Sequence, residues 1–103
     1  MPHMLLIHEP IGQRAARDEL EGRATYDRML RWGDELRSRG LLLAAESLAS
    51  TDKAVRVSNP QGKARIVDGP FAEAKEMVGG FFLVDVDTRE EAIALAQQCP
   101  AAG

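Results

Sequence analysis

Short apolar runs and two longer periodic stretches divide the chain into predicted strands and helices. Residues 4–9 (MLLIHE), 41–48 (LLLAAESL) and 80–87 (GFFLVDVD) have the length and apolar content of β-strands. Residues 54–69 (AVRVSNPQGKARIVDG) alternate apolar and polar positions on either side of an Asn-Pro-Gln-Gly turn. This pattern predicts a β-hairpin flanked by solvent.

The two periodic stretches are typical of amphipathic helices. The first begins after Asp18, which forms an N-cap pattern with Glu21 as the capping-box acid, and Gly40 marks its end. The second covers residues 88–99 (TREEAIALAQQC) and opens with a T-x-x-E capping box. The stripes expected to be buried are Tyr26, Met29, Leu30, Gly33 and Leu36 on the first helix, and Ala92, Leu95, Ala96 and Cys99 on the second.

The order strand, helix, strand, hairpin, strand, helix predicts an α+β domain, a ferredoxin-like split βαβ unit with an inserted β-hairpin. That layout ends with one more strand, whereas the sequence ends at residues 99–103 (CPAAG). We therefore expect a single domain over residues 1–103 that lacks the last C-terminal strand. Three explanations stay open: a shortened terminus, a strand supplied from elsewhere, or a sheet without it.

The three main strands are apolar on both faces, and such strands are covered on both sides. Two helices with one apolar stripe each cover only one face of a sheet. A second copy laid sheet on sheet across a two-fold axis would cover the other face, so we expect a homodimer. The alternative is a monomer whose hairpin folds over the open face. The opposed sets are Leu5 and Ile7 against Met4 and Leu6, Leu41 and Leu43 against Leu42 and Ala44, and Phe82 and Val84 against Phe81 and Leu83.

Composition narrows the class of protein. The chain has 103 residues, enough for one core, and its 13 basic and 16 acidic residues give a net charge of -3. This balance argues against direct binding to nucleic acid or to an anionic membrane surface. No apolar run is long enough for a membrane span, and the single cysteine, Cys99, fits a reducing compartment, so a cytoplasmic location is expected.

Metal and cofactor sites are not expected. The two histidines and one cysteine show no metal-ligand spacing. The VGGFF segment leads into a strand rather than the N-terminus of a helix, so it is not a phosphate loop.

Residues 67–86 (VDGPFAEAKEMVGGFFLVDV) resemble the DGPF-motif branch of the YCII-related proteins. The resemblance covers nearly the whole chain, including the segments MLLI, ELRSRGLLLAAESL and EEAIALAQQCP. It implies a ferredoxin-like α+β fold that dimerises as an α/β-barrel, and relatives that continue with one more strand.

The resemblance implies two different kinds of function. Members of the DGPF branch look like companions of extracytoplasmic-function sigma factors, which implies a protein partner. The broader family includes enzymes that remove chloride from chlorinated muconolactones, and other members carry a His/Asp pair. The positions of that pair fall near Met29 and Ser38 here, so the pair is absent and its chemistry does not carry over.

Several charged residues that could act in catalysis or binding lie between the predicted hairpin and the last predicted strand. Asp68, Glu73, Lys75 and Glu76 lie within nine residues, and acids near a cation at a buried strand can acquire shifted pKa values. Lys75 with Glu73 is a candidate substrate-binding pair for an anionic group, and Asp68 or Glu73 a candidate acid or base. The alternative is an exposed turn whose charges keep it solvated.

A second candidate pair is His8 with Glu46. Each follows an apolar series on one face of its strand, Met4 and Leu6 for His8, Leu42 and Ala44 for Glu46. If the two meet across adjacent strands, they form an acid/base pair in the barrel cavity. The alternative is a hydrogen-bonded histidine at the edge of the core.

These patterns predict a cytoplasmic homodimer with a polar cleft for a small anionic molecule, with acid/base chemistry of the lyase or isomerase type. The rival prediction, from a different class, is a non-catalytic protein partner in sigma-factor-linked signalling that binds through its helix or hairpin surface. An enclosed pocket with convergent polar groups would favour the first, and an exposed apolar patch the second.

Overall fold

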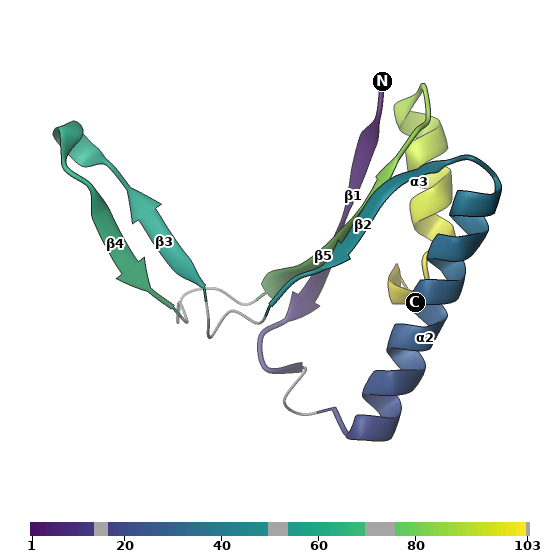
Figure 1. Cartoon of the computed structure of the whole chain (residues 1–103), viewed down its shortest axis with the longest axis horizontal. Helices are drawn as coiled ribbons and strands as arrows, with labels where there is room; N and C mark the ends of the chain where they lie inside the picture. The colour runs from purple at the N-terminus through teal and green to yellow at the C-terminus, as the bar shows by residue number, and fades with distance from the viewer. Residues whose placement is uncertain (14–16, 50–53, 70–75, 103) are drawn as a thin grey trace.

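Strands and helices follow one another in the order that the sequence predicts (Figure 1). The structure is a computed structural model, and it describes residues 1–13, 17–49, 54–69 and 76–102. The elements are β1 (His3–Pro10), α2 (Glu19–Ser38), β2 (Leu42–Ser47), β3 (Val55–Ser58), β4 (Arg65–Asp68), β5 (Glu76–Val84) and α3 (Arg89–Gln98), with 3-10 turns at Pro60–Gly62 and Pro100–Ala102.

β5 is the central strand of a three-stranded antiparallel sheet with the order β1-β5-β2. Both outer strands run antiparallel to β5 and therefore parallel to each other, and α2 connects them, which is a split βαβ arrangement. β3 and β4 form a separate two-stranded sheet. The described residues thus form a mixed α+β structure with an open sheet and no closed barrel.

β5 is longer at its start than the sequence pattern predicts. The prediction began at Gly80, whereas the strand begins at Glu76, which pairs with Pro10 of β1. The pairing continues because one residue, Gly79, is left out of the β1 ladder: Ile7 pairs with Gly80 and the next residue of β1 pairs with Val78. Such a β-bulge keeps two strands paired across an irregular segment.

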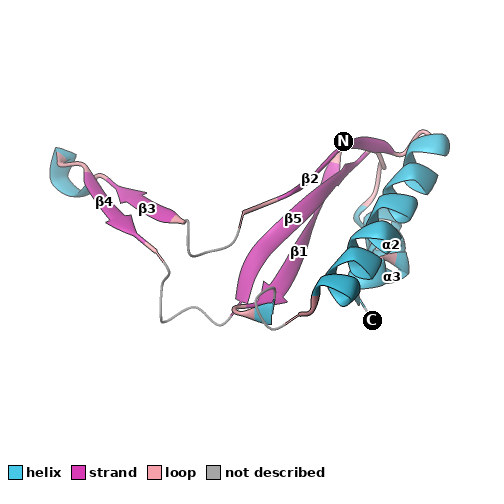
Figure 2. Cartoon of the chain, turned by 60° about the horizontal axis from the view of Figure 1, so that its bottom comes forward, coloured by secondary structure: helices cyan, strands magenta, loops and turns pink. Residues whose placement is uncertain are grey.

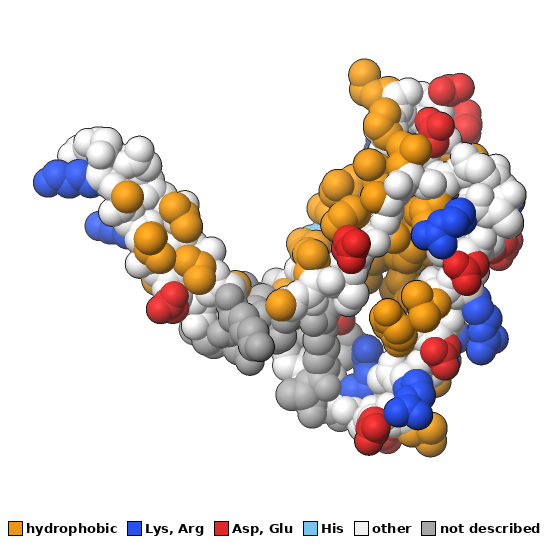
Figure 3. Space-filling view, in the orientation of Figure 1, with side chains coloured by type: hydrophobic (Ala, Val, Ile, Leu, Met, Phe, Trp, Pro, Cys, Tyr) orange, Lys and Arg blue, Asp and Glu red, His pale blue; other side chains and the backbone are white. Residues whose placement is uncertain are grey.

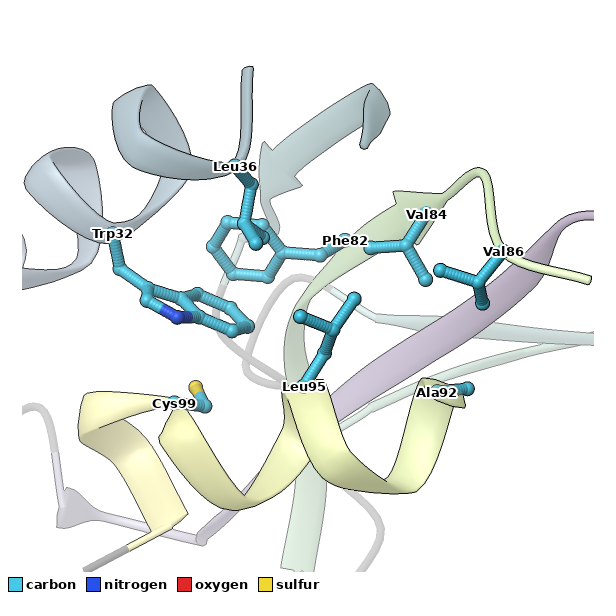
Figure 4. Close-up of a cluster of buried hydrophobic side chains, with 8 residues drawn as sticks. All are labelled: Trp32, Leu36, Phe82, Val84, Val86, Ala92, Leu95 and Cys99. Atoms are coloured by element: carbon cyan, nitrogen blue, oxygen red, sulfur yellow. The ribbon is translucent and has the colours of Figure 1, made fainter. Parts of the chain in front are cut away.

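Both helices lie on the same side of the three-stranded sheet (Figure 2). α2 contacts β2 and α3 contacts β1, and one hydrophobic core fills the space between the layers. Trp32 meets Phe82 edge to face, with ring centroids 4.7 Å apart and planes at 70°, a favourable aromatic geometry. Leu36 and Val84 are the most deeply buried side chains. The core comprises Trp32, Leu36, Phe82, Val84, Val86, Ala92, Leu95 and Cys99 (Figure 4).

The predicted helix caps are confirmed. The Asp18 carboxylate accepts a hydrogen bond from the Glu21 backbone N–H at 2.7 Å. The Thr88 hydroxyl accepts one from the Glu91 backbone N–H at 3.1 Å and donates to the Glu91 carboxylate at 3.2 Å, a complete capping box. Gly40 has φ of 72° just after the end of α2, a conformation that glycine adopts without strain.

The buried face of α2 differs from the prediction. Tyr26 and Leu30 are 56% and 49% exposed, so these two members of the predicted stripe do not reach the core, whereas Met29 packs against it. Trp32, which the predicted stripe did not include, is buried beside Leu36. The α2 residues that are buried or half-buried are Gly22, Thr25, Met29, Trp32, Gly33 and Leu36.

The β3–β4 hairpin stands apart from the sheet and the helices (Figure 1). All eight residues of its two strands are exposed. The radius of gyration is 16.1 Å, compared with about 13 Å for a compact chain of this length. The predicted alternative, a hairpin folded over the open face of its own sheet, is therefore wrong for this structure.

The face of the sheet that the helices do not cover is called the open face below. Along β1 the side chains alternate between half-buried and exposed, and Met4 and Leu6, on the open face, are 52% and 49% exposed. Leu43 of β2 is 54% exposed. The open face therefore presents large apolar side chains to solvent. None of the described helices combines the length and the apolar character needed to cross a membrane.

Candidate functional site

A groove runs along α2, between this helix and the sheet. Its volume is about 1090 Å³, slightly above the range of about 300–1,000 Å³ that is usual for small-molecule sites. Small residues on both walls create it, because α2 presents Gly22 and Thr25 where its second half presents Trp32 and Leu36. The sheet side of the groove also contains small side chains. They are Ala45 and Ser47 of β2 and Gly79 and Gly80 of β5.

The helix side of the groove carries three arginines. Arg37 donates to the Asp34 carboxylate at 3.2 Å, and Arg28 donates to the Thr25 hydroxyl at 3.3 Å. No described residue bonds to the Arg17 guanidinium. Guanidinium groups at a half-open groove are suited to carboxylate or phosphate oxygens, which they bind through two parallel hydrogen bonds.

His8 and Glu46 both border this groove, at the sheet side of its rim. Each is exposed, and strand alternation places each on the open face, His8 with Leu6 and Glu46 beside Phe81. The two do not lie on adjacent strands, because β5 separates β1 from β2. Strands two apart in a sheet are separated by roughly 10 Å, so the predicted direct contact between His8 and Glu46 is not made within one chain.

The other predicted site residues are not part of this groove. Asp68 ends β4, pairs in register with Val55, and is exposed on the hairpin. Glu73 and Lys75 lie outside the described residues. The structure therefore brings Asp68 together with neither His8 nor Glu46.

The three-stranded sheet contains acids but no lysine or arginine in any of its strands. Glu46 and Glu76 lie on the open face, and Asp85 follows directly after β5. Any cation that serves an anionic ligand near His8 must therefore come from outside the sheet. The arginines of α2 and of the segment before it line the groove on the helix side of the sheet, whereas His8 alternates to the open face.

The sequence did not single out Arg17, Arg28 and Arg37, because the spacing of these residues gives no indication of the groove that they line. Glu19 and Arg23, four residues apart on α2, form an ion pair at 3.4 Å with both side chains exposed. The signal that could have indicated the groove is the presence of Gly22 and Thr25 at helical spacing on the buried face, together with the double glycine of β5.

Two further kinds of chemistry concern the Cys99 thiol and side chains that could bind a metal ion. Burial raises the pKa of the Cys99 thiol, and hydrogen bonds from the backbone N–H groups of Ala101 and Ala102 partly offset this effect. Cys99 is therefore a neutral core thiol at physiological pH. In the part of the chain that the structure describes, no three His, Cys, Asp or Glu side chains are grouped so that they could hold a metal ion.

A family model described as the YCII-related domain matches residues 1–103, and the chain belongs to this family. Among curated proteins it is similar to an uncharacterized protein of Rhizobium meliloti (strain 1021). The two are 36% identical over 58 residues, which are 56% of this chain and 47% of that protein. The chain thus spans about half the length of the curated relative it matches, whose name states no activity.

Proposed function

We propose that the protein binds a small anionic molecule in the groove between α2 and the sheet. The observation that supports this proposal is that Arg17, Arg28 and Arg37 border the same groove as His8 and Glu46. Arg17, whose guanidinium bonds to no described residue, would hold a carboxylate or phosphate group of the ligand. His8 and Glu46 alternate to the open face of the sheet, so they would act as acid or base only on a part of the ligand that extends around the sheet. The chemistry would then be that of an acid/base lyase or isomerase.

Arg17→Ala tests the binding proposal. A charge-assisted hydrogen bond contributes about 1.5–3 kcal/mol, so the variant should bind a carboxylate or phosphate ligand at least tenfold more weakly. The probes are small mono- and dicarboxylates and sugar phosphates, each beside its neutral amide or alcohol analogue, measured by NMR titration. Arg39→Ala is the matched control, because Arg39 is exposed just beyond α2 and does not line the groove.

Two results would overturn the binding proposal: neutral analogues that bind as tightly as the anions, or equal losses in Arg17→Ala and Arg39→Ala. Once an anionic ligand is found, His8→Gln and Glu46→Gln test catalysis. Both should abolish turnover of the ligand while leaving its dissociation constant within a few-fold. Unchanged turnover in both variants would leave a binding protein without these catalytic residues.

We also propose that the chain works in the cytoplasm as a homodimer, in which the ferredoxin-like domains pair as an α/β-barrel. The exposed apolar residues Met4, Leu6 and Leu43 support this proposal, because a second copy would cover them. Leu6→Asp should shift the protein from dimer to monomer in light scattering coupled to size exclusion. Leu20→Asp is the control, since Leu20 is 79% exposed on α2; a monomeric parent protein would contradict the proposal.

The second candidate function is a non-catalytic partner in sigma-factor-linked signalling, as members of the DGPF branch of the family are thought to be. The hairpin favours it, because Val57 and Ile66 are each 69% exposed and form an apolar surface that a protein could cover. Co-purification of a sigma factor, lost in Val57→Asp and kept in Arg17→Ala, would support this function. The opposite pattern of losses would exclude the hairpin as its binding surface.

A further inference from the structure

The side of α2 that lines the groove changes from basic to apolar along the helix. A Cβ atom placed on Gly22 would lie 3.7 Å from Cδ of Arg17, so the aliphatic part of this half-buried arginine lies against Gly22. Further along α2, helical spacing places Tyr26, Met29 and Leu30 on the same side of the helix as Gly22. All of these residues line the groove. The apolar stripe of Tyr26, Met29 and Leu30 therefore follows directly on the position of Arg17.

The chain leaves much of this apolar stripe uncovered. Tyr26 and Leu30 are exposed, and Met29 is half-buried. Leu42 and Phe82 of the sheet line the same groove. Figure 3 shows hydrophobic side chains on the side of α2 toward the sheet, with Lys or Arg side chains above and below them. A ligand with an apolar body would bury this surface, and the removal of apolar area from water favours binding.

The groove is larger than a small acid requires. Its volume of about 1090 Å³ is sufficient for a drug-sized molecule. From Gly22 to Gly33, which also lines the groove, α2 rises by roughly 16 Å, because each residue of an α-helix adds about 1.5 Å. A ligand held at Arg17 therefore has room for a long body beside the apolar stripe.

The acids near Arg17 favour a ligand with a single negative charge. Asp18 and Glu19 follow Arg17 in the chain and line the groove as well. Glu19 is paired with Arg23. The Asp18 carboxylate accepts from the backbone N–H of Glu21, which is an uncharged donor. A phosphate monoester would bring a second negative charge close to this carboxylate, and like charges repel. A carboxylate ligand needs only the two parallel hydrogen bonds that one guanidinium donates.

We propose that the groove binds an amphipathic monocarboxylate, whose carboxylate lies at Arg17 and whose alkyl or aryl body lies along the apolar stripe. This inference rests on the proposed function and narrows its ligand from any small anion to one class. Sugar phosphates and short dicarboxylates would leave the stripe exposed to water and would bring a second charge into the groove. The preferred ligand therefore combines one charged end with a long apolar body.

The length of the apolar body gives the first test. Linear carboxylates from butyrate to decanoate, titrated by calorimetry below their micelle concentrations, should bind up to about fourfold more tightly for each added methylene. Suberate, which has the chain length of octanoate and a second carboxylate, should bind at least tenfold more weakly than octanoate. Octyl phosphate should also bind more weakly. Affinities that do not depend on chain length would overturn this inference, as would suberate or octyl phosphate binding as tightly as octanoate.

Variants of the groove give the second test. Leu30→Asn should weaken the binding of decanoate at least about fivefold and leave butyrate nearly unchanged, because Leu30 lies roughly 12 Å from Gly22 along the helix axis. Arg17→Ala should weaken both acids by the same factor. Leu20→Asn is the matched control, since Leu20 is exposed on α2 and does not line the groove. Equal losses of decanoate binding in Leu30→Asn and Leu20→Asn would contradict the inference.

Contacts in solution give the position of the bound ligand. Nuclear Overhauser effects should connect the terminal methyl group of decanoate to the Tyr26 ring and to the methyl groups of Leu30. Effects to Met4 and Leu6 in their place would overturn the inference, because the alkyl chain would then lie on the open face.

Two patterns of results separate this inference from the anion-binding function. If all carboxylates bind alike and Arg17→Ala weakens each of them, this inference is wrong and the anion-binding function stands. If decanol binds as tightly as decanoate, or if no carboxylate binds, both are wrong.

Discussion

A Cβ atom placed on Gly80 would lie 2.6 Å from the backbone carbonyl oxygen of Glu46. No side chain fits there, because β2 and β5 approach each other directly over this glycine. We therefore predict that Gly80→Ala forces β2 away from β5 and lowers the free energy of unfolding by about 1–3 kcal/mol. Chemical denaturation monitored by the fluorescence of Trp32, the single tryptophan, measures the loss.

Gly33→Ala is the matched control for this prediction. Its Cβ would meet Phe82 at 3.5 Å, an ordinary contact, and alanine favours a helix interior over glycine by about 1 kcal/mol. Gly33→Ala should therefore leave stability unchanged or increase it. Equal destabilisation by the two substitutions would show that the approach of Glu46 is not the cause.

The capping box of α3 supplies a second prediction. Thr88→Ala removes the hydroxyl that accepts from the Glu91 N–H, and should lower the free energy of unfolding by about 1 kcal/mol. Thr88→Ser keeps the hydroxyl and should lose little. If Thr88→Ser is as destabilising as Thr88→Ala, the methyl group of the threonine matters more than the cap.

The core gives a third prediction. Leu36 is 1% exposed and lies with Trp32 between α2 and the sheet. Leu36→Ala should lower the free energy of unfolding by about 2–5 kcal/mol through lost burial and a residual cavity. Leu30→Ala is the control, since Leu30 is 49% exposed and should change stability by well under half of that amount. Similar losses at the two positions would contradict the observed orientation of α2.

The Cys99 thiol gives a prediction about pH. Its pKa is higher in the folded protein than in the unfolded chain, because burial disfavours the thiolate. The contribution of Cys99 to stability is therefore complete below the unfolded pKa, roughly 8.5, and is lost as the pH rises through the folded pKa.

Urea unfolding of the parent protein and of Cys99→Ala, compared from pH 7 to 10, checks this sign. The parent should lose more stability over this range than the variant. Parallel pH profiles would mean that the thiol titrates alike in both states.

The sequence predicted those features that depend on neighbours along the chain. Thr88 with Glu91, and Asp18 with Glu21, signal helix starts because each cap is made within one turn. The hairpin was predicted for the same reason, since its Asn-Pro-Gln-Gly turn and alternating flanks are local.

Features that depend on distant segments were predicted less well. The buried face of α2 is decided by Trp32, whose partner Phe82 comes from the other end of the chain. Alternation placed Glu46 on the face of Leu42, but the irregularity between Leu42 and Ala44 leaves Leu42 on the helix side and Glu46 on the open face. The order of the strands, with β5 between β1 and β2, is likewise a tertiary property. The groove required small residues of α2 and β5 to face each other, which no single segment indicates.

The bulge at Gly79 also decides what a change in chain length would do. Because this residue stands outside the β1 ladder, the residues on either side of it alternate as if it were absent, with Met77 buried and Glu76 exposed. Loss of the Gly79 codon would remove the residue that is left out of the β1 ladder, and Ile7 would still pair with Gly80 and His8 with Val78. Met77 would stay on the helix side and Glu76 on the open face. A three-nucleotide deletion here would therefore shorten β5 without turning either face of the sheet over, whereas the same deletion in the regular part of the strand would move the preceding residues to the opposite face.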